Sequence, residues 1–91
     1  MSLQFEWDEE KALANIKKHR ISFELAAQVF LDDSRIEIYD KEHSIDEDRY
    51  ITIGKAGKVL FVVYTERTLN IRLISARLAD ADERRLYYGQ F

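Results

Sequence analysis

Hydrophobic residues recur at helical spacing through the first third of the chain. A helix is predicted over Glu9–His19 and a second over Phe23–Leu31. The apolar stripes are Ala12, Leu13 and Ile16 in the first helix and Phe23, Ala26, Ala27 and Phe30 in the second. Asp8 and Ser22 precede these segments, and both are residue types that cap helix N-termini.

From Arg35 onward the hydrophobic period changes from helical spacing to two. Alternating or continuous apolar positions predict four strands, over residues 35–39, 49–53, 59–65 and 71–77. Residues 54–57, which begin and end with glycine, are predicted to form a hairpin turn, and residues 66–70 the next turn. Asp80 and Glu83 have the spacing of a capping box, which predicts a third helix to about Tyr88.

This order of elements predicts a single α+β domain over residues 1–91. Short connections favour antiparallel neighbours, so we expect a four-stranded antiparallel sheet with the two N-terminal helices over one face and a C-terminal helix. The other face of the sheet is expected to be partly open. Phe5 and Trp7 flank a short entry segment before the first helix.

Composition and charge narrow the classes of function. The chain has no cysteine, which excludes disulfides and thiolate zinc sites. Its longest apolar run, residues 59–64, is far shorter than the roughly 20 residues needed to span a bilayer, and we expect a soluble, cytoplasmic protein without a signal peptide. The net charge is −3, but residues 1–48 hold six Lys and Arg against thirteen Asp and Glu, whereas residues 49–91 hold eight against four. A basic C-terminal half is compatible with an anionic ligand.

The arginines of this basic half are the first candidates for a functional site. They are Arg49, Arg67, Arg72, Arg77, Arg84 and Arg85. Guanidinium groups bind phosphate in a bidentate manner and stabilise negative charge that develops in a transition state. The alternative is that they pair with the acidic residues of the N-terminal half, although we expect one or two to remain available for an anion.

His43 lies within the acidic segment of residues 40–48. Its side chain could transfer protons at neutral pH, could belong to a site for a hard metal ion, or could simply be solvated in a loop. Tyr87 and Tyr88 follow two arginines, so one of them could stack on a base, or both could attach the last helix to the sheet.

Five groups of residues, in order along nearly the whole chain, resemble the pattern of the BrnT family, toxins of type II toxin–antitoxin systems. They are Phe5-Glu-Trp-Asp-Glu-Glu-Lys11, Asn15-x-x-Lys18-His19, Ile21-Ser-Phe-Glu24 with Ala26-Ala27, His43-Ser44 with Glu47-Asp48-Arg49, and Ile71-Arg72-x-Ile74-Ser-Ala-Arg77 with Glu83-Arg84 and Tyr88. One departure is Arg20, which stands where the family commonly has a glycine that ends the helix.

The resemblance implies a small ribonuclease toxin with a RelE-like fold that stops translation by cutting RNA. It also implies a BrnA-type ribbon-helix-helix antitoxin as partner, with DNA contacted only through that antitoxin, and neither a metal nor another cofactor. The alternative is a non-catalytic interaction module or co-repressor partner of a small DNA-binding protein.

A metal-independent ribonuclease of this kind needs a base, an acid and cations around the phosphate. The candidate cations are Arg77, then Arg72, Arg67 and Arg49. Glu66 or His43 could act as the base, Tyr88 or His43 could assist proton transfer or stacking, and Arg84 could bind RNA.

Overall fold

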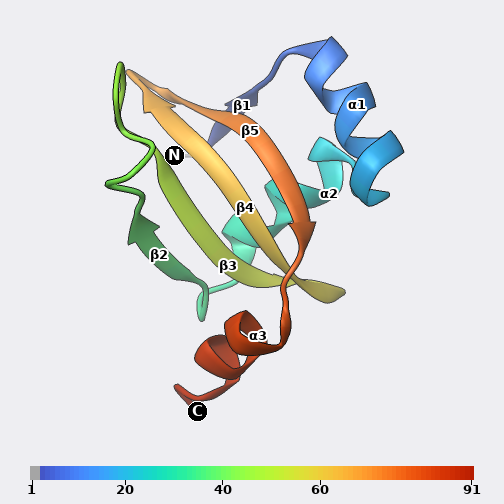
Figure 1. Cartoon of the computed structure of the whole chain (residues 1–91), viewed down its shortest axis with the longest axis vertical. Coiled ribbons are helices and arrows are strands. Elements are labelled where there is room, and N and C mark those ends of the chain that lie inside the picture. The colour runs from blue at the N-terminus through green and yellow to red at the C-terminus, as the bar shows by residue number, and fades with distance from the viewer. Residues whose placement is uncertain (1–2) are drawn as a thin grey trace.

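A computed structural model describes residues 3–91 as five strands, three α-helices and one short 3-10 helix (Figure 1). The elements are β1 (Gln4–Glu6), α1 (Glu9–His19), α2 (Phe23–Gln28), η1 (Val29–Leu31), β2 (Ile36–Tyr39), β3 (Tyr50–Ala56), β4 (Lys58–Arg67), β5 (Asn70–Leu78) and α3 (Ala81–Tyr88). The helices and the last four strands agree with the sequence prediction to within a few residues, because their hydrophobic periods are long enough to identify them.

The sheet has five strands in the order β1-β5-β4-β3-β2, and β2 to β5 form an antiparallel meander. The prediction of a four-stranded antiparallel sheet was therefore wrong in one respect. Residues 4–6 add a strand that runs parallel to β5, with Phe5 opposite Ile71 and Glu6 opposite Arg72. Three residues are too few to show a strand period, so the pattern could not reveal this pairing.

One face of the sheet is covered by α1, α2 and η1, as the prediction required (Figure 1). The core there contains Phe23, Ala26 and Val29 from the helices and Leu60 and Tyr64 from β4, each at most 2% exposed. The opposite face is covered at one end only, where α3 packs Tyr87 and the preceding Ala79 against Ile53 and Val59. The remainder of this second face is open and is called the open face below.

Helix α1 is attached to the sheet by Ala12, which belongs to its predicted apolar stripe, and by Asn15, which does not. Leu13 and Ile16 are 65% and 40% exposed, whereas Asn15 is only 7% exposed. The Asn15 side-chain N–H groups donate to the carbonyls of Ala76 and Ile21 at 2.9 and 2.8 Å, and its carbonyl accepts from the Ala76 N–H at 3.1 Å. A polar side chain therefore fixes the helix at a buried position where the pattern predicted apolar contacts.

The hairpin between β3 and β4 is also tighter than predicted. Gly54 lies inside β3, and only Gly57 forms the turn, with a φ of +75°. A Cβ atom at Gly54 would approach Val29 Cγ1 to 2.6 Å, so this glycine allows η1 to lie directly on the strand. None of the helices described within residues 3–91 has the length and apolar character needed to cross a membrane.

Candidate functional site

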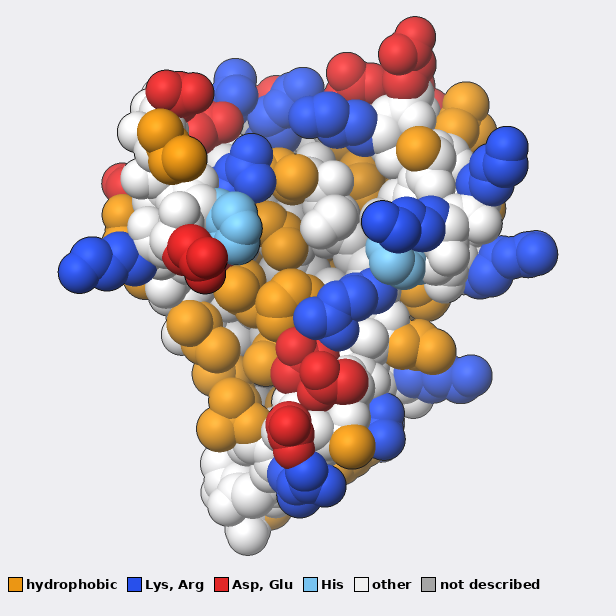
Figure 2. Space-filling view, in the orientation of Figure 1, with side chains coloured by type: hydrophobic (Ala, Val, Ile, Leu, Met, Phe, Trp, Pro, Cys, Tyr) orange, Lys and Arg blue, Asp and Glu red, His pale blue; other side chains and the backbone are white. Residues whose placement is uncertain are grey.

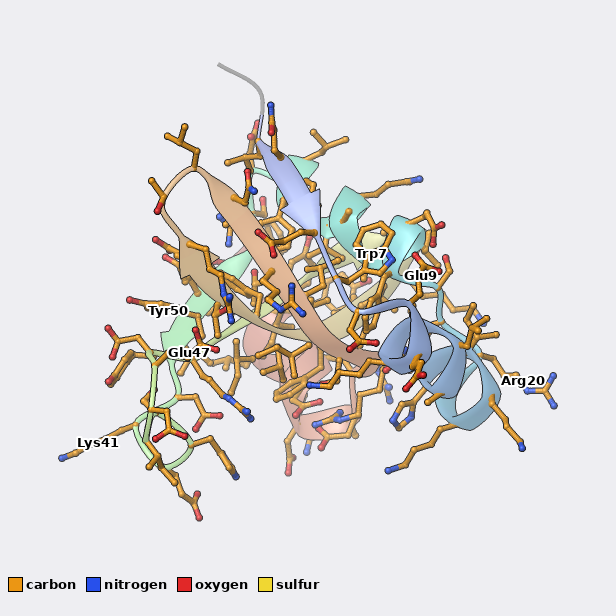
Figure 3. All side chains as sticks on the ribbon, turned by 90° about the horizontal axis from the view of Figure 1, so that it is seen from above. Trp7, Glu9, Arg20, Lys41, Glu47 and Tyr50 are labelled. Carbon is orange, nitrogen blue, oxygen red and sulfur yellow. The ribbon has the colours of Figure 1, made fainter. Side chains whose placement is uncertain are left out.

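The open face holds a cavity of about 370 Å³ beneath the loop that joins β2 to β3. Its lining comprises Asp40, Glu42, His43, Arg49, Ile51, Phe61, Val63, Ile74 and Ser75. Figure 2 looks onto this face, where hydrophobic side chains cover the middle and Lys and Arg side chains gather along the upper edge. From above, the loop that carries Lys41 and Glu47 projects from one side of the sheet, and α1 lies at the other side (Figure 3). We call this hollow the open-face cavity.

The base of the loop is closed by Ser44. Its hydroxyl donates to the Asp40 carbonyl at 2.6 Å and accepts from the Arg49 N–H at 2.8 Å, while the Asp40 N–H donates to the Arg49 carbonyl at 2.9 Å. These bonds join the two ends of the loop. They place His43 and Arg49 on the same wall of the cavity.

Asp40 also orients His43. The imidazole Nδ1 lies 2.9 Å from the Asp40 carboxylate, and the His43 side chain is 60% exposed while that of Asp40 is only 14% exposed. In the neutral imidazole, a carboxylate at this position accepts the Nδ1–H and leaves Nε2 with its lone pair. The imidazole therefore has one fixed nitrogen and one nitrogen available to a ligand.

Arg77 lies on the open face of β5, next to the cavity. Its guanidinium stacks on the Phe61 ring at 3.9 Å and makes two hydrogen bonds with the Glu83 carboxylate, at 2.8 and 2.9 Å. The hydrogen bonds that Arg77 donates to Glu83 raise the pKa of Arg77, and the same contact lowers the pKa of Glu83. Glu83 therefore fixes the guanidinium in place and cancels much of its charge.

Arg72 and Arg67 also have acidic partners. Arg72 donates to Glu6 at 2.7 Å, and hydrogen bonds to that carboxylate from Asn70 and Arg72 lower the pKa of Glu6. Arg67 pairs with Glu47 at 3.3 Å in a contact that is about half exposed. Arg85, the remaining paired member of the arginine set, contacts Asp82. Four of the six arginines are therefore paired with acids. Only Arg72 and Arg67 pair with acids of the N-terminal half, which is the alternative offered by the sequence, because Glu83 and Asp82 belong to the C-terminal half.

Arg49 and Arg84 differ from these four, because within residues 3–91 no carboxylate lies at ion-pair distance from either one. Arg49 lines the open-face cavity. Arg84 donates to the Ala79 carbonyl at 2.7 Å and lines a separate cleft with Tyr88, which is 48% exposed, and Lys55. The structure does not bring Arg84 and Tyr88 together with His43.

Glu66 lies apart from both groups. By strand alternation it shares the covered face of β4 with Tyr64, and it is paired in register with Ile71. Thr65 and Arg67, its neighbours, point to the opposite side, where Thr65 is in register with Arg72. The structure therefore does not place the Glu66 carboxylate at the open-face cavity.

Sequence reasoning missed two residues of this region, Asp40 and Thr65. Asp40 stands three residues before His43, a spacing that could have suggested the pair. Ser75 lines the cavity because strand alternation puts it on the same face of β5 as Arg77, where it is paired with Val63. Thr65 is 1% exposed, and its hydroxyl has no hydrogen-bond partner within the described part of the chain.

The fold and this site define a class: small α+β proteins whose half-open sheet face carries cations and a histidine. Comparison with known proteins gives that class a function. Residues 7–83 match a protein-family model described as the ribonuclease toxin BrnT of type II toxin–antitoxin systems. The chain therefore belongs to the BrnT family of ribonuclease toxins.

A solved structure has a similar fold. The crystal structure of the Brucella abortus ribonuclease toxin BrnT, determined at 1.1 Å resolution, superposes with a TM-score of 0.69 and 24% sequence identity, covering 87% of this chain and 99% of that chain. This likeness supports the arrangement of the elements. No curated protein sequence matches the chain.

Proposed function

We propose that this ribonuclease cleaves RNA without a metal ion, by attack of a ribose 2′-hydroxyl on the adjacent phosphorus in the open-face cavity. The O5′–phosphorus bond breaks, and the products are a 2′,3′-cyclic phosphate and a 5′-hydroxyl end. The observation that carries the proposal is the closure of the loop by Ser44. It holds on one cavity wall an oriented histidine and an arginine without an ion-pair partner in residues 3–91. Loss of intact RNA would then stop translation.

His43 is the group proposed to move protons. With Nδ1 held by Asp40, its Nε2 is available to remove the proton from the 2′-hydroxyl, and the resulting imidazolium can protonate the leaving 5′-oxygen. Asp40 would act as a positioning residue, since it fixes the tautomer and the ring orientation. Glu66 is left out of this mechanism because it lies on the covered face of the sheet.

Among the arginines, Arg49 is proposed to contribute most to binding the pentacoordinate phosphate. Its charge is not compensated by a carboxylate within residues 3–91, whereas the charges of Arg77 and Arg72 are offset by Glu83 and Glu6. Arg77 has one Nη2–H and its Nε–H left after its hydrogen bonds, and these can still reach a phosphate oxygen. Arg67, at the end of β4, would hold the flanking backbone.

The test is an RNA cleavage assay with purified protein and EDTA present. His43→Gln should slow cleavage by about 10²–10⁴-fold, the usual contribution of a general acid–base group. Arg49→Ala should slow it by about 10²–10³-fold, as expected for loss of one donor to a developing negative charge. Lys41→Ala, in the same loop but pointing away from the sheet, is the matched control and should cleave normally (Figure 3).

Two outcomes would refute this mechanism. One is loss of cleavage when EDTA is added, which would show a need for a metal ion. The other is normal cleavage of a substrate with a 2′-deoxy sugar at the cleavage position, since such a sugar has no nucleophile to offer. A folded His43→Gln or Arg49→Ala protein with full activity would remove that residue from the site.

The partner expected for this class of toxin is an antitoxin. We propose a BrnA-like ribbon-helix-helix protein, so that the complex meets operator DNA only through the antitoxin, and both proteins act in the cytoplasm. Co-expression with the adjoining small reading frame tests this proposal. Copurification of the two proteins and a gel shift of the upstream DNA that requires the second protein are the expected results, and a partner without DNA affinity would contradict the proposal.

A further inference from the structure

A groove of about 340 Å³ lies on the covered side of the sheet, between the end of α1, the helix α2 and the β3–β4 turn. Its floor is apolar and includes Ile21, Leu25, Leu60 and Leu78, of which Leu78 is 47% exposed. Its rim carries His19, Arg20 and Lys58. The open-face cavity lies on the other side of the sheet, so the two hollows are separate surfaces.

The charge around the groove is of one sign. Among the described residues 3–91, no Asp or Glu lines the groove. None lines the neighbouring cleft either, which shares Gly57, Lys58 and Leu78 with the groove and adds Lys55 and Arg84. Within residues 3–91, neither Arg20 nor Lys58 has a carboxylate at ion-pair distance. In a chain with a net charge of −3, this is a basic surface with an apolar centre.

Arg20 holds its position at a conformational cost. It ends α1 with a φ of +62°, in the left-handed region that glycine adopts freely, while its N–H donates to the Ile16 carbonyl at 2.8 Å. An L-residue is disfavoured in this region because its Cβ approaches the following carbonyl oxygen. The side chain points away from the body of the protein (Figure 3). The groove therefore has a cation at its rim where a glycine would have been easier to accommodate.

We propose that this groove binds a segment of the cognate antitoxin in which apolar side chains are flanked by Asp or Glu. The apolar floor matches the apolar side chains, and the unpaired cations match the carboxylates. Single-stranded RNA fits less well, because the floor has no aromatic ring on which a base could stack. The inference rests on the antitoxin that the class of toxin implies, and it does not depend on the catalytic roles proposed for His43 and Arg49.

The experiment measures the affinity of the purified toxin for the antitoxin expressed from the adjoining reading frame. Arg20→Gly removes a cation and relieves the left-handed backbone, so any loss of binding cannot come from unfolding. Combined with Lys58→Ala, it should raise the Kd by about tenfold or more, the loss of roughly 1.4 kcal/mol. Lys41→Ala removes one charge from the distant loop and should leave the Kd within about twofold, as expected for an exposed charge outside the interface.

Hydrogen–deuterium exchange on the wild-type pair locates the interface directly. Protection of residues 19–25 and 56–60 on antitoxin binding supports the groove, whereas protection confined to the loop of residues 40–49 overturns the proposal. An unchanged Kd for the double variant also overturns it, as does RNA that competes with the antitoxin for the groove. RNA cleavage by the same double variant should stay at the wild-type rate, so failure of the docking site and failure of the proposed reaction give different results.

Discussion

At the scale of single residues, the Asn15 side chain contributes most clearly to the stability of the fold. Replacing Asn15 with Leu removes three hydrogen bonds and leaves the N–H and C=O of Ala76 and the C=O of Ile21 without this partner. Unsatisfied buried backbone groups make this change costly, and we expect the free energy of unfolding to fall by about 2–3 kcal/mol. The free energy of unfolding is measured by urea denaturation, with circular dichroism as the signal.

The neighbouring Leu13 supplies the control for this prediction. Its side chain is 65% exposed, so Leu13→Ala should change the free energy of unfolding by less than about 0.5 kcal/mol. If the two variants were equally stable, the Asn15 hydrogen bonds would not hold α1 on the sheet. Hydropathy alone predicts that the Leu13 substitution is the more destabilising of the two, because it places Leu13 in the helix interface and Asn15 outside it.

At the scale of elements, the packing of η1 on β3 depends on the absence of a side chain at Gly54. A Cβ atom there would lie 2.6 Å from Val29 Cγ1 and 2.9 Å from Arg35 Cβ. Gly54→Ala should therefore push η1 off the strand and lower the free energy of unfolding by about 1–3 kcal/mol, the usual cost of overpacking a core.

Gly57→Ala is the matched control for Gly54→Ala. Gly57 has open space around it but a φ of +75°, so its substitution carries only backbone strain, about 1 kcal/mol. Double-mutant analysis with Val29→Ala distinguishes overpacking at Gly54 from backbone strain at Gly57. Val29→Ala should reduce the cost of Gly54→Ala and leave that of Gly57→Ala unchanged.

The attachment of α3 gives a prediction for alkaline pH. Tyr87 is 4% exposed and its O–H donates to Asp32 at 2.5 Å. Burial and this hydrogen bond raise the pKa of Tyr87 to about 12 from 10.0. The folded state therefore binds the phenolic proton more tightly than the unfolded state does. The stability that Tyr87 contributes through this proton is complete below pH 10 and is lost as the pH rises through about 12.

The measurement compares wild type with Tyr87→Phe in urea denaturation between pH 8 and pH 12. The wild-type protein should lose stability more steeply above pH 10, because the variant has no phenol to ionise and keeps the ring packing. Parallel curves for the two proteins would show that the Tyr87 proton is not linked to folding.

The limits of sequence reasoning are clearest at the level of elements. Sustained patterns, such as the alternation over residues 49–53 or the continuous apolar run over residues 59–65, predicted strands and helices because many positions contribute to the same pattern. The three residues of β1 were missed, since their place in the sheet depends on pairing with Asn70, Ile71 and Arg72 far along the chain. Gly54 was assigned to a turn because the η1 segment that requires a glycine there is also distant in the sequence.

Dependence on contacts between residues far apart in the sequence also limits prediction of the site. The arginines were found from composition, but which of them stays unpaired depends on tertiary contacts, such as that of Arg72 with Glu6. Glu66 was a candidate base until its register with Ile71 placed it on the covered face. His43 and Arg49 lie together because of a side-chain bond to Ser44, and hydrophobic periodicity carries no information about such bonds.

At the scale of the whole molecule, a chain with a net charge of −3 has to bind a polyanion through local cations. Binding of single-stranded RNA should weaken as salt increases, and the slope of log K against log salt should become shallower by about 0.7 for each phosphate that the protein no longer neutralises. Arg49→Ala in a His43→Gln background, which prevents cleavage, should reduce the slope by this amount. An identical slope for the two proteins would mean that Arg49 does not bind a phosphate.

The hydrogen bonds of Asn15 also determine where the sheet can be extended by another strand. β1 pairs only with the first three residues of β5, and the backbone beyond them would otherwise be open to a strand from another chain. The Asn15 amide takes up both backbone groups of Ala76 in that stretch. The sheet edge that Asn15 does not block is β2, at the opposite side of the sheet, where Ile38 and Tyr39 are exposed.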